Sequence, residues 1–241
     1  SAFNQDIGNW DVSSVSKTNN LFKAATSFDQ DLNNWNTSNF VELANVFYGA
    51  SQFNRDLSNW DVSNVQNMNG TFRDATYFNK DISNWDVSSV KFFGSTFMRA
   101  SSFNQDLANW NVSNAEWMNQ MFRESAFNQD ISNWDVSSVK SMNTMFGLNY
   151  VFNQDISLWN TSSVNDMKQM FYKTSSFNQD LSGWCVPLIS SLPTWFSTGS
   201  SLLSSYHPNW GDCPCSDTII TQPQDFTYLS GNSSAPSFFV S

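Results

Sequence analysis

Hydrophobic and polar residues follow a pattern along this chain that returns every 25 residues. Each repeat, here called a coil, opens with Phe and has Asp at position 4, Ile or Leu at position 5 and Trp at position 8. The eight opening residues are Phe3, Phe28, Phe53, Phe78, Phe103, Phe127, Phe152 and Phe177. The step from Phe103 to Phe127 is 24 residues long. A fixed period in this range predicts that the coils stack and bury their apolar sides against one another.

Two spacings of apolar residues within a coil predict one strand and one helix. Around Trp60 and Val62 the spacing matches the short inward-facing strand of a leucine-rich repeat. Val65, Met68 and Phe72 fall on one stripe of a helix of about two turns. The sequence therefore predicts an α/β solenoid like a leucine-rich repeat, with one short parallel strand and one short helix per coil, eight coils and a C-terminal cap. A right-handed parallel β-helix with a helical insertion per coil is the alternative fold.

The composition indicates a large, ring-rich core and argues against several classes of protein. The 241 residues include 22 Phe, 11 Trp and 6 Tyr. The formal net charge is -10, so the clustered basic face of a nucleic-acid binder is not expected. No apolar run approaches the roughly 20 residues that a membrane-spanning helix needs. Because the chain begins at Ser1 inside a repeat, we expect it to be part of a longer, processed protein.

Aspartate recurs at position 4 of every coil, as at Asp56, Asp81 and Asp106. Stacked carboxylates repel one another unless each accepts hydrogen bonds or a cation lies between them. The first interpretation is that these residues cap a turn, and the alternative is a row of calcium sites. No other cofactor is expected. Since a catalytic site is ordinarily unique and this feature recurs, no enzyme is expected either. The sole histidine, His207, is expected to have a structural or solvated role in the cap.

Residues that differ from coil to coil are the candidates for recognition. At position 15, on the outer side of the predicted helix, Phe92 and Trp117 replace the polar residues of other coils. Two exposed rings one coil apart form a candidate contact patch, and packing against local side chains is the alternative. On the strand side the outward positions are small, polar and acidic, and Asp61, Asp86 and Asn111 are candidate binding residues there.

The repeat consensus resembles a known family. Phe-Asn-Gln-Asp-Ile/Leu-Ser-x-Trp-Asp-Val-Ser-x-Val-x-x-Met-x-x-Met-Phe is similar to the BspA-like leucine-rich repeat of bacterial surface proteins and lipoproteins, over roughly Ser1 to Cys215. This resemblance implies a secreted, surface-exposed and non-enzymatic protein of adhesive character. It does not fix a ligand.

The three cysteines fit the secreted class that the resemblance implies. A bridge from Cys185, in the last coil, to Cys213 would hold the cap over the end of the core, and Cys215 is the rival partner. A bridge closing a loop of about 30 residues adds roughly 3 kcal/mol in the chain-entropy model. Residues 1–215 are expected to form the repeats, with a disulfide-closed cap from about residue 184. Residues 216–241 resemble a linker and the start of an immunoglobulin-like domain.

These inferences lead to one functional expectation and one alternative. We expect an extracellular, cell-surface repeat module of a large adhesin, which presents an extended face to a glycan or protein of another cell or matrix. The alternative is a passive spacer or filament-forming repeat without a ligand of its own. Other domains of the same long chain are expected partners, whereas nucleic acid, and insertion of this segment into a membrane, are not.

Overall fold

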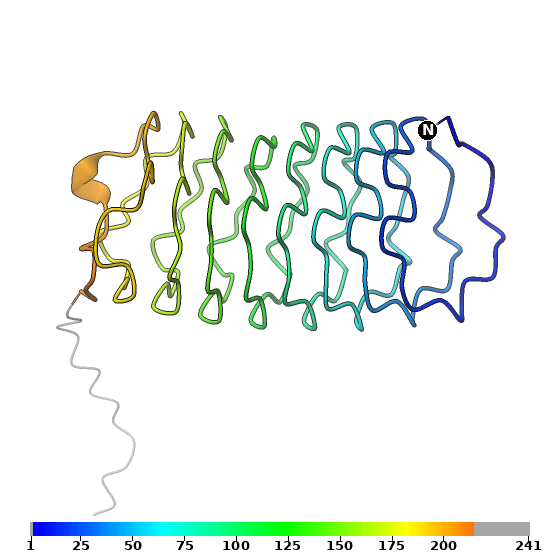
Figure 1. Cartoon of the computed structure of the whole chain (residues 1–241), viewed down its shortest axis with the longest axis horizontal. Coiled ribbons are helices and arrows are strands. Elements are labelled where there is room, and N and C mark those ends of the chain that lie inside the picture. Colours follow the sequence, from blue (N-terminus) through cyan, green and yellow to red (C-terminus); the bar gives the residue numbers. More distant parts are fainter. Residues whose placement is uncertain (1, 215–241) are drawn as a thin grey trace, which may run out of the picture.

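The chain winds into coils that stack along one long axis. A computed structural model describes residues 2–214. The first coil lies at one end, in blue, and the C-terminal cap lies at the other, in orange (Figure 1). Backbone hydrogen bonds join neighbouring coils: Leu43 N–H donates to Asn67 O over 2.9 Å, and Asn45 N–H donates to Asn69 O over 2.8 Å. Each 25-residue repeat is therefore one coil of the stack.

The predicted α/β solenoid with a leucine-rich-repeat strand and helix in every coil is wrong. Within residues 2–214 the regular elements reduce to one 3-10 helix, η1, at Ser204–Tyr206. Parallel pairing is limited to isolated bridges along one column, which runs through Lys17, Glu42, Asn67, Phe92, Trp117, Ser141 and Asp166. The alternative β-helix fails for the same reason, because these bridges do not extend into a sheet. The bridges also lie in the segment predicted to be helical, and the Trp-x-Val segment predicted to be a strand has none.

Overlapping turns take the place of the predicted helix. In the second coil three turns are closed by the N–H groups of Val46, Tyr48 and Ala50, which donate to Leu43, Asn45 and Phe47 O over 3.0 to 3.2 Å. The N–H groups between them reach the next coil instead, as Phe47 N–H does to Thr71 O over 2.8 Å. The third residues of the first and last turns, Asn45 and Gly49, have φ values of 57° and 71°, and a positive φ at this place is typical of type II turns. Bonds within a coil thus alternate with bonds between coils.

The turn geometry explains why the spacing looked helical. In a helix and in this series of turns alike, residues three or four positions apart lie on the same side of the backbone. Val65, Met68 and Phe72 therefore face the core here as they would from a helix. The difference lies in the backbone, because half of its N–H groups bond to a neighbouring coil. An apolar pattern does not report that difference.

Aromatic rings stack along the whole core. Phe72 packs on Phe78 with ring centroids 4.0 Å apart, and Trp60 stacks on Trp85 at 6.3 Å. The indole N–H of each Trp from Trp35 to Trp184 donates to a carbonyl of the preceding coil, as Trp85 does to Leu57 O over 3.0 Å. The core positions are therefore buried as the pattern predicts in the second to seventh coils, and the polar atom of each buried indole is paired. The prediction is wrong for Phe3 and Trp10 of the first coil and for Leu192 of the eighth, which are exposed.

Polar side chains repeat as regularly as the rings. The position 2 side chain accepts from the backbone N–H of the same position in the next coil, as Asn54 Oδ1 does from Asn79 N–H over 3.0 Å. In several coils a glutamine at position 3 donates a second hydrogen bond to the position 2 side chain of the preceding coil, as Gln105 Nε2 does to Asn79 Oδ1 over 2.9 Å. These bonds hold the register of the stack, because a shift by one residue would break all of them together.

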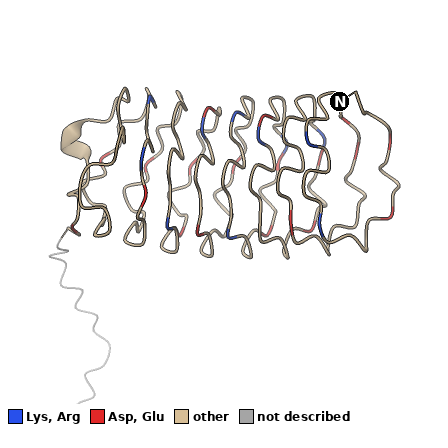
Figure 2. Ribbon diagram, viewed as in Figure 1, with Lys and Arg blue, Asp and Glu red and all other residues tan. Residues whose placement is uncertain are grey.

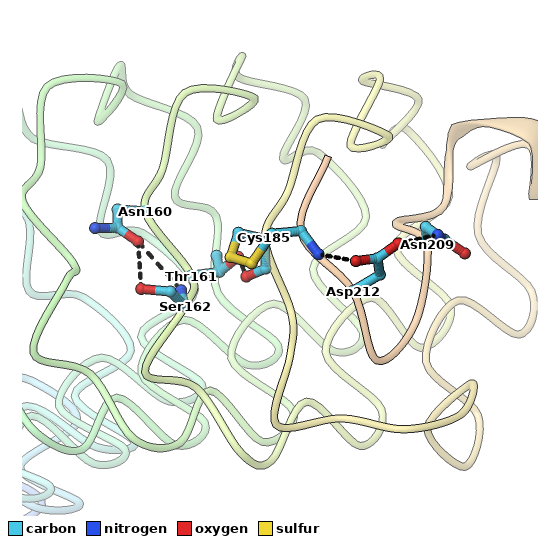
Figure 3. Close-up of a disulfide and its surroundings, with 7 residues drawn as sticks. Asn160, Thr161, Ser162, Cys185, Asn209 and Asp212 are labelled. Atoms are coloured by element: carbon cyan, nitrogen blue, oxygen red, sulfur yellow. Dashed lines mark hydrogen bonds between the residues drawn. A yellow bond between two sulfur atoms is a disulfide. The ribbon is translucent and has the colours of Figure 1, made fainter. Parts of the chain in front are cut away.

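A cap closes the C-terminal end of the stack. Cys185 is bonded to Cys213, and Cys185 O accepts from Thr161 Oγ1 over 2.7 Å, which ties the last two coils together (Figure 3). Asp212 accepts from Asn209 Nδ2 over 2.9 Å and from Cys213 N–H over 2.8 Å. The rival partner Cys215 and the expected domain at 216–241 lie outside the described residues. In the part of the chain that is described, no helix has the length and apolar character to cross a membrane.

Candidate binding face

Phe92 and Trp117 lie side by side on the outside of the stack. They form one of the parallel bridges between coils, and their exposed fractions are 36% and 38%. Phe93 N–H donates to Trp117 O over 2.8 Å, and Trp117 N–H donates to Lys91 O over 3.1 Å. The two residues are therefore on a bridged column and not on a helix, but they are neighbouring exposed aromatic residues, as expected.

Charged residues stand immediately before the aromatic pair in the sequence. Glu116 pairs with Lys140, and its Oε1 lies 4.0 Å from Lys91 Nζ. The hydrogen bond from Lys140 lowers the pKa of Glu116. Figure 2 shows basic and acidic residues interspersed along the stack, in contrast to a continuous basic face. The three residues occupy position 14 of three successive coils, so a row of paired charges runs next to the aromatic column.

A small hollow lies beside the pair on the same outer surface. Positions 15 and 17 flank the buried position 16, so Gly94 and Asn119 follow Phe92 and Trp117 on the outside. The hollow has a volume of about 200 Å³ and is lined by Asn45, Asn69, Gly70, Arg73, Gly94, Ser95 and Asn119. A Cβ on Gly94 would lie 2.7 Å from Asn69 Oδ1, so glycine keeps this space open. Asn119 Oδ1 is buried and has no hydrogen-bond partner within residues 2–214.

We call the aromatic pair, the three charged residues and the hollow together the aromatic face. It combines two apolar rings with amide and guanidinium groups that donate and accept hydrogen bonds. Such a surface is suited to a ligand that has both apolar C–H faces and hydroxyl groups.

The other candidate binding residues lie on a separate column. Asp61, Asp86 and Asn111 are exposed, and each accepts hydrogen bonds from the serine two residues later, as Asp61 Oδ1 does from Ser63 Oγ over 2.6 Å. The hydroxyl of Ser88, followed by its N–H, lowers the pKa of Asp86. Among the described residues, no hydrogen bond, ion pair or ring contact joins this column to Phe92 or Trp117. The structure thus does not bring the two sets into one site.

The position 4 carboxylates are engaged with their own backbone. Asp56, Asp81 and Asp106 accept through Oδ1 from the N–H two residues later, over 2.9, 2.8 and 2.8 Å. The N–H of Ser83, followed by its hydroxyl, lowers the pKa of Asp81. Within residues 2–214 no three Asp, Glu, His or Cys side chains come together in a group that could hold a metal ion. These bonds match the turn-capping interpretation, and the calcium alternative has no cluster to support it.

His207 lies in the cap, where it shares a hydrogen bond of 2.8 Å with Ser197 Oγ through Nε2. Its ring packs edge-on against Phe196 at 5.5 Å, and burial lowers its pKa. No carboxylate contacts this histidine among the described residues, so the pair lacks the acidic member of a catalytic triad. The contacts fix the cap segment to the end of the core.

A comparison with protein families places the chain in one of them. The model of a family described as Mycoplasma protein of unknown function, DUF285, matches residues 1–68, 32–126 and 116–210. The chain belongs to this family. The three overlapping matches establish a repeat module, and they do not support the leucine-rich-repeat class specifically. No curated protein and no solved structure matches the chain.

Sequence reasoning missed much of what makes this member of the DUF285 family irregular. The charged residues Lys91, Glu116 and Lys140 stand at position 14, which is Ser, Val, Gln or Asn in the other coils. Gly94 stands at position 17, where Asn is common. A comparison of each column with its own consensus would have revealed both departures, next to the aromatic pair.

Proposed function

We propose that this repeat module is an extracellular part of a surface adhesin that binds a glycan through the aromatic face. The observation that carries the proposal is the pair of exposed rings, Phe92 and Trp117, on a column that is polar in all the other coils. Exposed rings in neighbouring coils provide apolar surface for the C–H faces of a sugar. The amides of the hollow beside them supply the hydrogen bonds that sugar hydroxyls require.

The extracellular location has two supports. The Cys185–Cys213 disulfide is typical of proteins in oxidising compartments. The resemblance of the repeat consensus to BspA-like surface proteins points to the same place. We also propose that the module is not an enzyme, because its recurring carboxylates serve the turns of the scaffold. A protein of another cell or matrix, and other domains of a longer chain, are further partners that this role allows.

The test compares two double variants. Phe92→Ser with Trp117→Ser removes both rings, and Lys17→Ser with Glu42→Ser changes the same column in the first two coils. Both proteins and the wild type are measured on a glycan array and by calorimetry with the sugars that bind. We expect the aromatic variant to lose at least about tenfold in affinity, which corresponds to roughly 1.4 kcal/mol, while the control keeps wild-type affinity.

The opposite result supports the alternative function. If wild type binds no glycan, or if both variants bind as tightly as wild type, the aromatic face is not the site. A passive spacer without a ligand would then account better for the uniform bonding between coils.

A further inference from the structure

The missing residue of the 24-residue coil leaves a notch on the surface of the stack. The fifth coil, which opens at Phe103, ends at Ala126 and lacks the residue at position 25. At this place the structure has a hollow of about 500 Å³, lined by Ser101, Glu124, Ser125, Ala126, Leu148, Tyr150 and Val151. The fourth, fifth and sixth coils all contribute to it. The aromatic face draws most of its residues from the same three coils but lies at other positions of the repeat.

The notch interrupts a row of hydrogen bonds between coils. In the second and third coils, the position 24 carbonyl accepts from the N–H of position 25 in the next coil: Ser51 O does so from Tyr77 over 3.2 Å, and Thr76 O from Ser102 over 3.1 Å. Ser101 O is the next carbonyl in this row, and the residue that would donate to it is the one that is missing. Within residues 2–214 no hydrogen bond reaches Ser101 O. The notch therefore exposes a carbonyl whose counterparts in the two preceding coils accept from an amide N–H.

Apolar side chains border this carbonyl. Tyr150 and Val151 have exposed fractions of 57% and 46%, although positions 24 and 25 are mostly Ser, Thr or Gln in the other coils. Leu148 adds a third apolar side chain to the lining. The Glu124 carboxylate, 3.0 Å from Arg123 Nη2, and the hydroxyl-bearing Ser101 supply further polar groups at the edge.

A buried amide of the sixth coil bonds to the backbone next to the notch. Asn149 replaces the Ala common at position 23, and its Nδ2 donates to Phe127 O over 2.9 Å. Its Oδ1 accepts from Val151 and Phe152 N–H over 3.1 and 3.0 Å. These bonds hold the backbone of the sixth coil in place beside the notch.

We infer that the notch is a second ligand site, which binds an N-acetylated sugar. The acetamide N–H replaces the missing backbone donor to Ser101 O, and its methyl group rests on Val151 and Leu148. The sugar ring lies against Tyr150, and its hydroxyls bond to the carboxylate and hydroxyl at the edge. An N-acetylated sugar fits better than a plain hexose, because only the former has an amide donor next to an apolar group.

The test uses triacetylchitotriose, which carries acetamide groups, and cellotriose, which lacks them, on the purified protein by calorimetry. Tyr150→Ser removes the ring at the notch. Tyr77→Ser removes an equally exposed tyrosine, 57% in both cases, at position 25 of the third coil, three coils away from Tyr150. A third variant inserts one Ser between Ala126 and Phe127 and restores the 25-residue step. Thermal unfolding and tryptophan fluorescence check that each variant remains folded.

We expect triacetylchitotriose to bind wild type and Tyr77→Ser equally, Tyr150→Ser at least about tenfold more weakly, and the insertion variant not at all. Cellotriose is expected not to bind the notch. The inference is overturned if triacetylchitotriose does not bind wild type, if cellotriose binds as well, or if Tyr150→Ser and the insertion leave binding unchanged. It is also overturned if binding is lost in the Phe92→Ser, Trp117→Ser variant instead, because that result would assign the sugar to the aromatic face.

Discussion

Replacement of Asn149 by Ala is expected to destabilise the coil beside the notch more than an equivalent change elsewhere. The Asn149 side chain is completely buried, as are Phe127 and Phe152, which it bonds. Truncation leaves Phe127 O without its amide donor and Phe152 N–H without its acceptor. Each unpaired buried backbone group costs about 1 to 3 kcal/mol, so we expect a loss of about 3 kcal/mol.

The matched control is Thr174→Ala, at the same position of the next coil. Thr174 is also completely buried, but its hydroxyl makes one hydrogen bond, to Phe146 O over 2.8 Å. That carbonyl still accepts from Asn149 N–H over 3.0 Å after the change, so it stays paired. The control is therefore expected to lose only about 1 kcal/mol.

The assay is amide hydrogen exchange, because a stack of repeats unfolds in parts and has no single free energy of unfolding. A loss of about 3 kcal/mol speeds exchange of the Phe152 N–H roughly 100-fold. The Phe53 N–H, which donates to Ala50 O over 3.0 Å in a regular coil, reports any change at a distance. The reasoning is refuted if Asn149→Ala exchanges no faster at Phe152 than Thr174→Ala does, or if Phe53 is affected equally.

Two further predictions concern the cap and the carboxylates. Reduction of the Cys185–Cys213 bond, or the substitution Cys185→Ser, removes a link across 28 residues and is expected to destabilise the cap by roughly 3 kcal/mol. Both changes should lower the melting temperature, and reductant should not change the melting temperature of the Cys185→Ser variant any further. Equal melting with and without reductant in wild type would contradict it. Hydrogen bonds from serine lower the pKa values of seven carboxylates, Asp11, Asp81, Asp86, Asp130, Asp135, Asp155 and Asp180. The stability that these carboxylates contribute to the fold is therefore full above the unfolded pKa of about 3.9, and it is lost as the pH falls through the folded pKa values. Burial lowers the pKa of His207, so its contribution is full above about 6.5 and is lost as pH falls from there through the folded value. Melting curves of wild type and His207→Gln between pH 3 and 8 separate the two effects, and a flat wild-type profile would contradict both.

The sequence was sufficient to predict what repeats, but not how the backbone runs between the repeated positions. The period, the buried rings such as Phe72 and Trp60, and the role of Asp56 in a turn all follow from side chains whose environment is the same in each coil. The prediction of a strand and a helix in each coil was wrong because overlapping turns bury the same positions as a helix. Asn45 and Gly49 at the positive-φ positions gave a signal for turns, but Arg99 and Lys173 occupy the second of these positions in other coils and obscured it.

The candidate sites were predictable only where the departure from the repeat was a substitution. Phe92 and Trp117 stand out in a column of polar residues, and the structure places them next to each other and exposed. The deletion before Phe127 was equally visible in the sequence. Its consequence was not, because it depends on Ser101 O losing a donor from the next coil and on the bonds that Asn149 makes to Phe127 O and Phe152 N–H.

The substitutions and the deletion that depart from the repeat occur in the same part of the stack, and this bears on whether the module is a spacer or a binding module. Each coil contacts only its neighbours, so an irregular coil must be tolerated by the coils on either side of it. The fourth, fifth and sixth coils contain the aromatic pair, the paired charges and the notch, while the third coil keeps the regular bonds. A spacer gains nothing from irregular coils, which lose bonds between neighbours. A binding module gains a surface that is unique along an otherwise uniform stack, and the two double variants and the notch variants test that surface at two independent places.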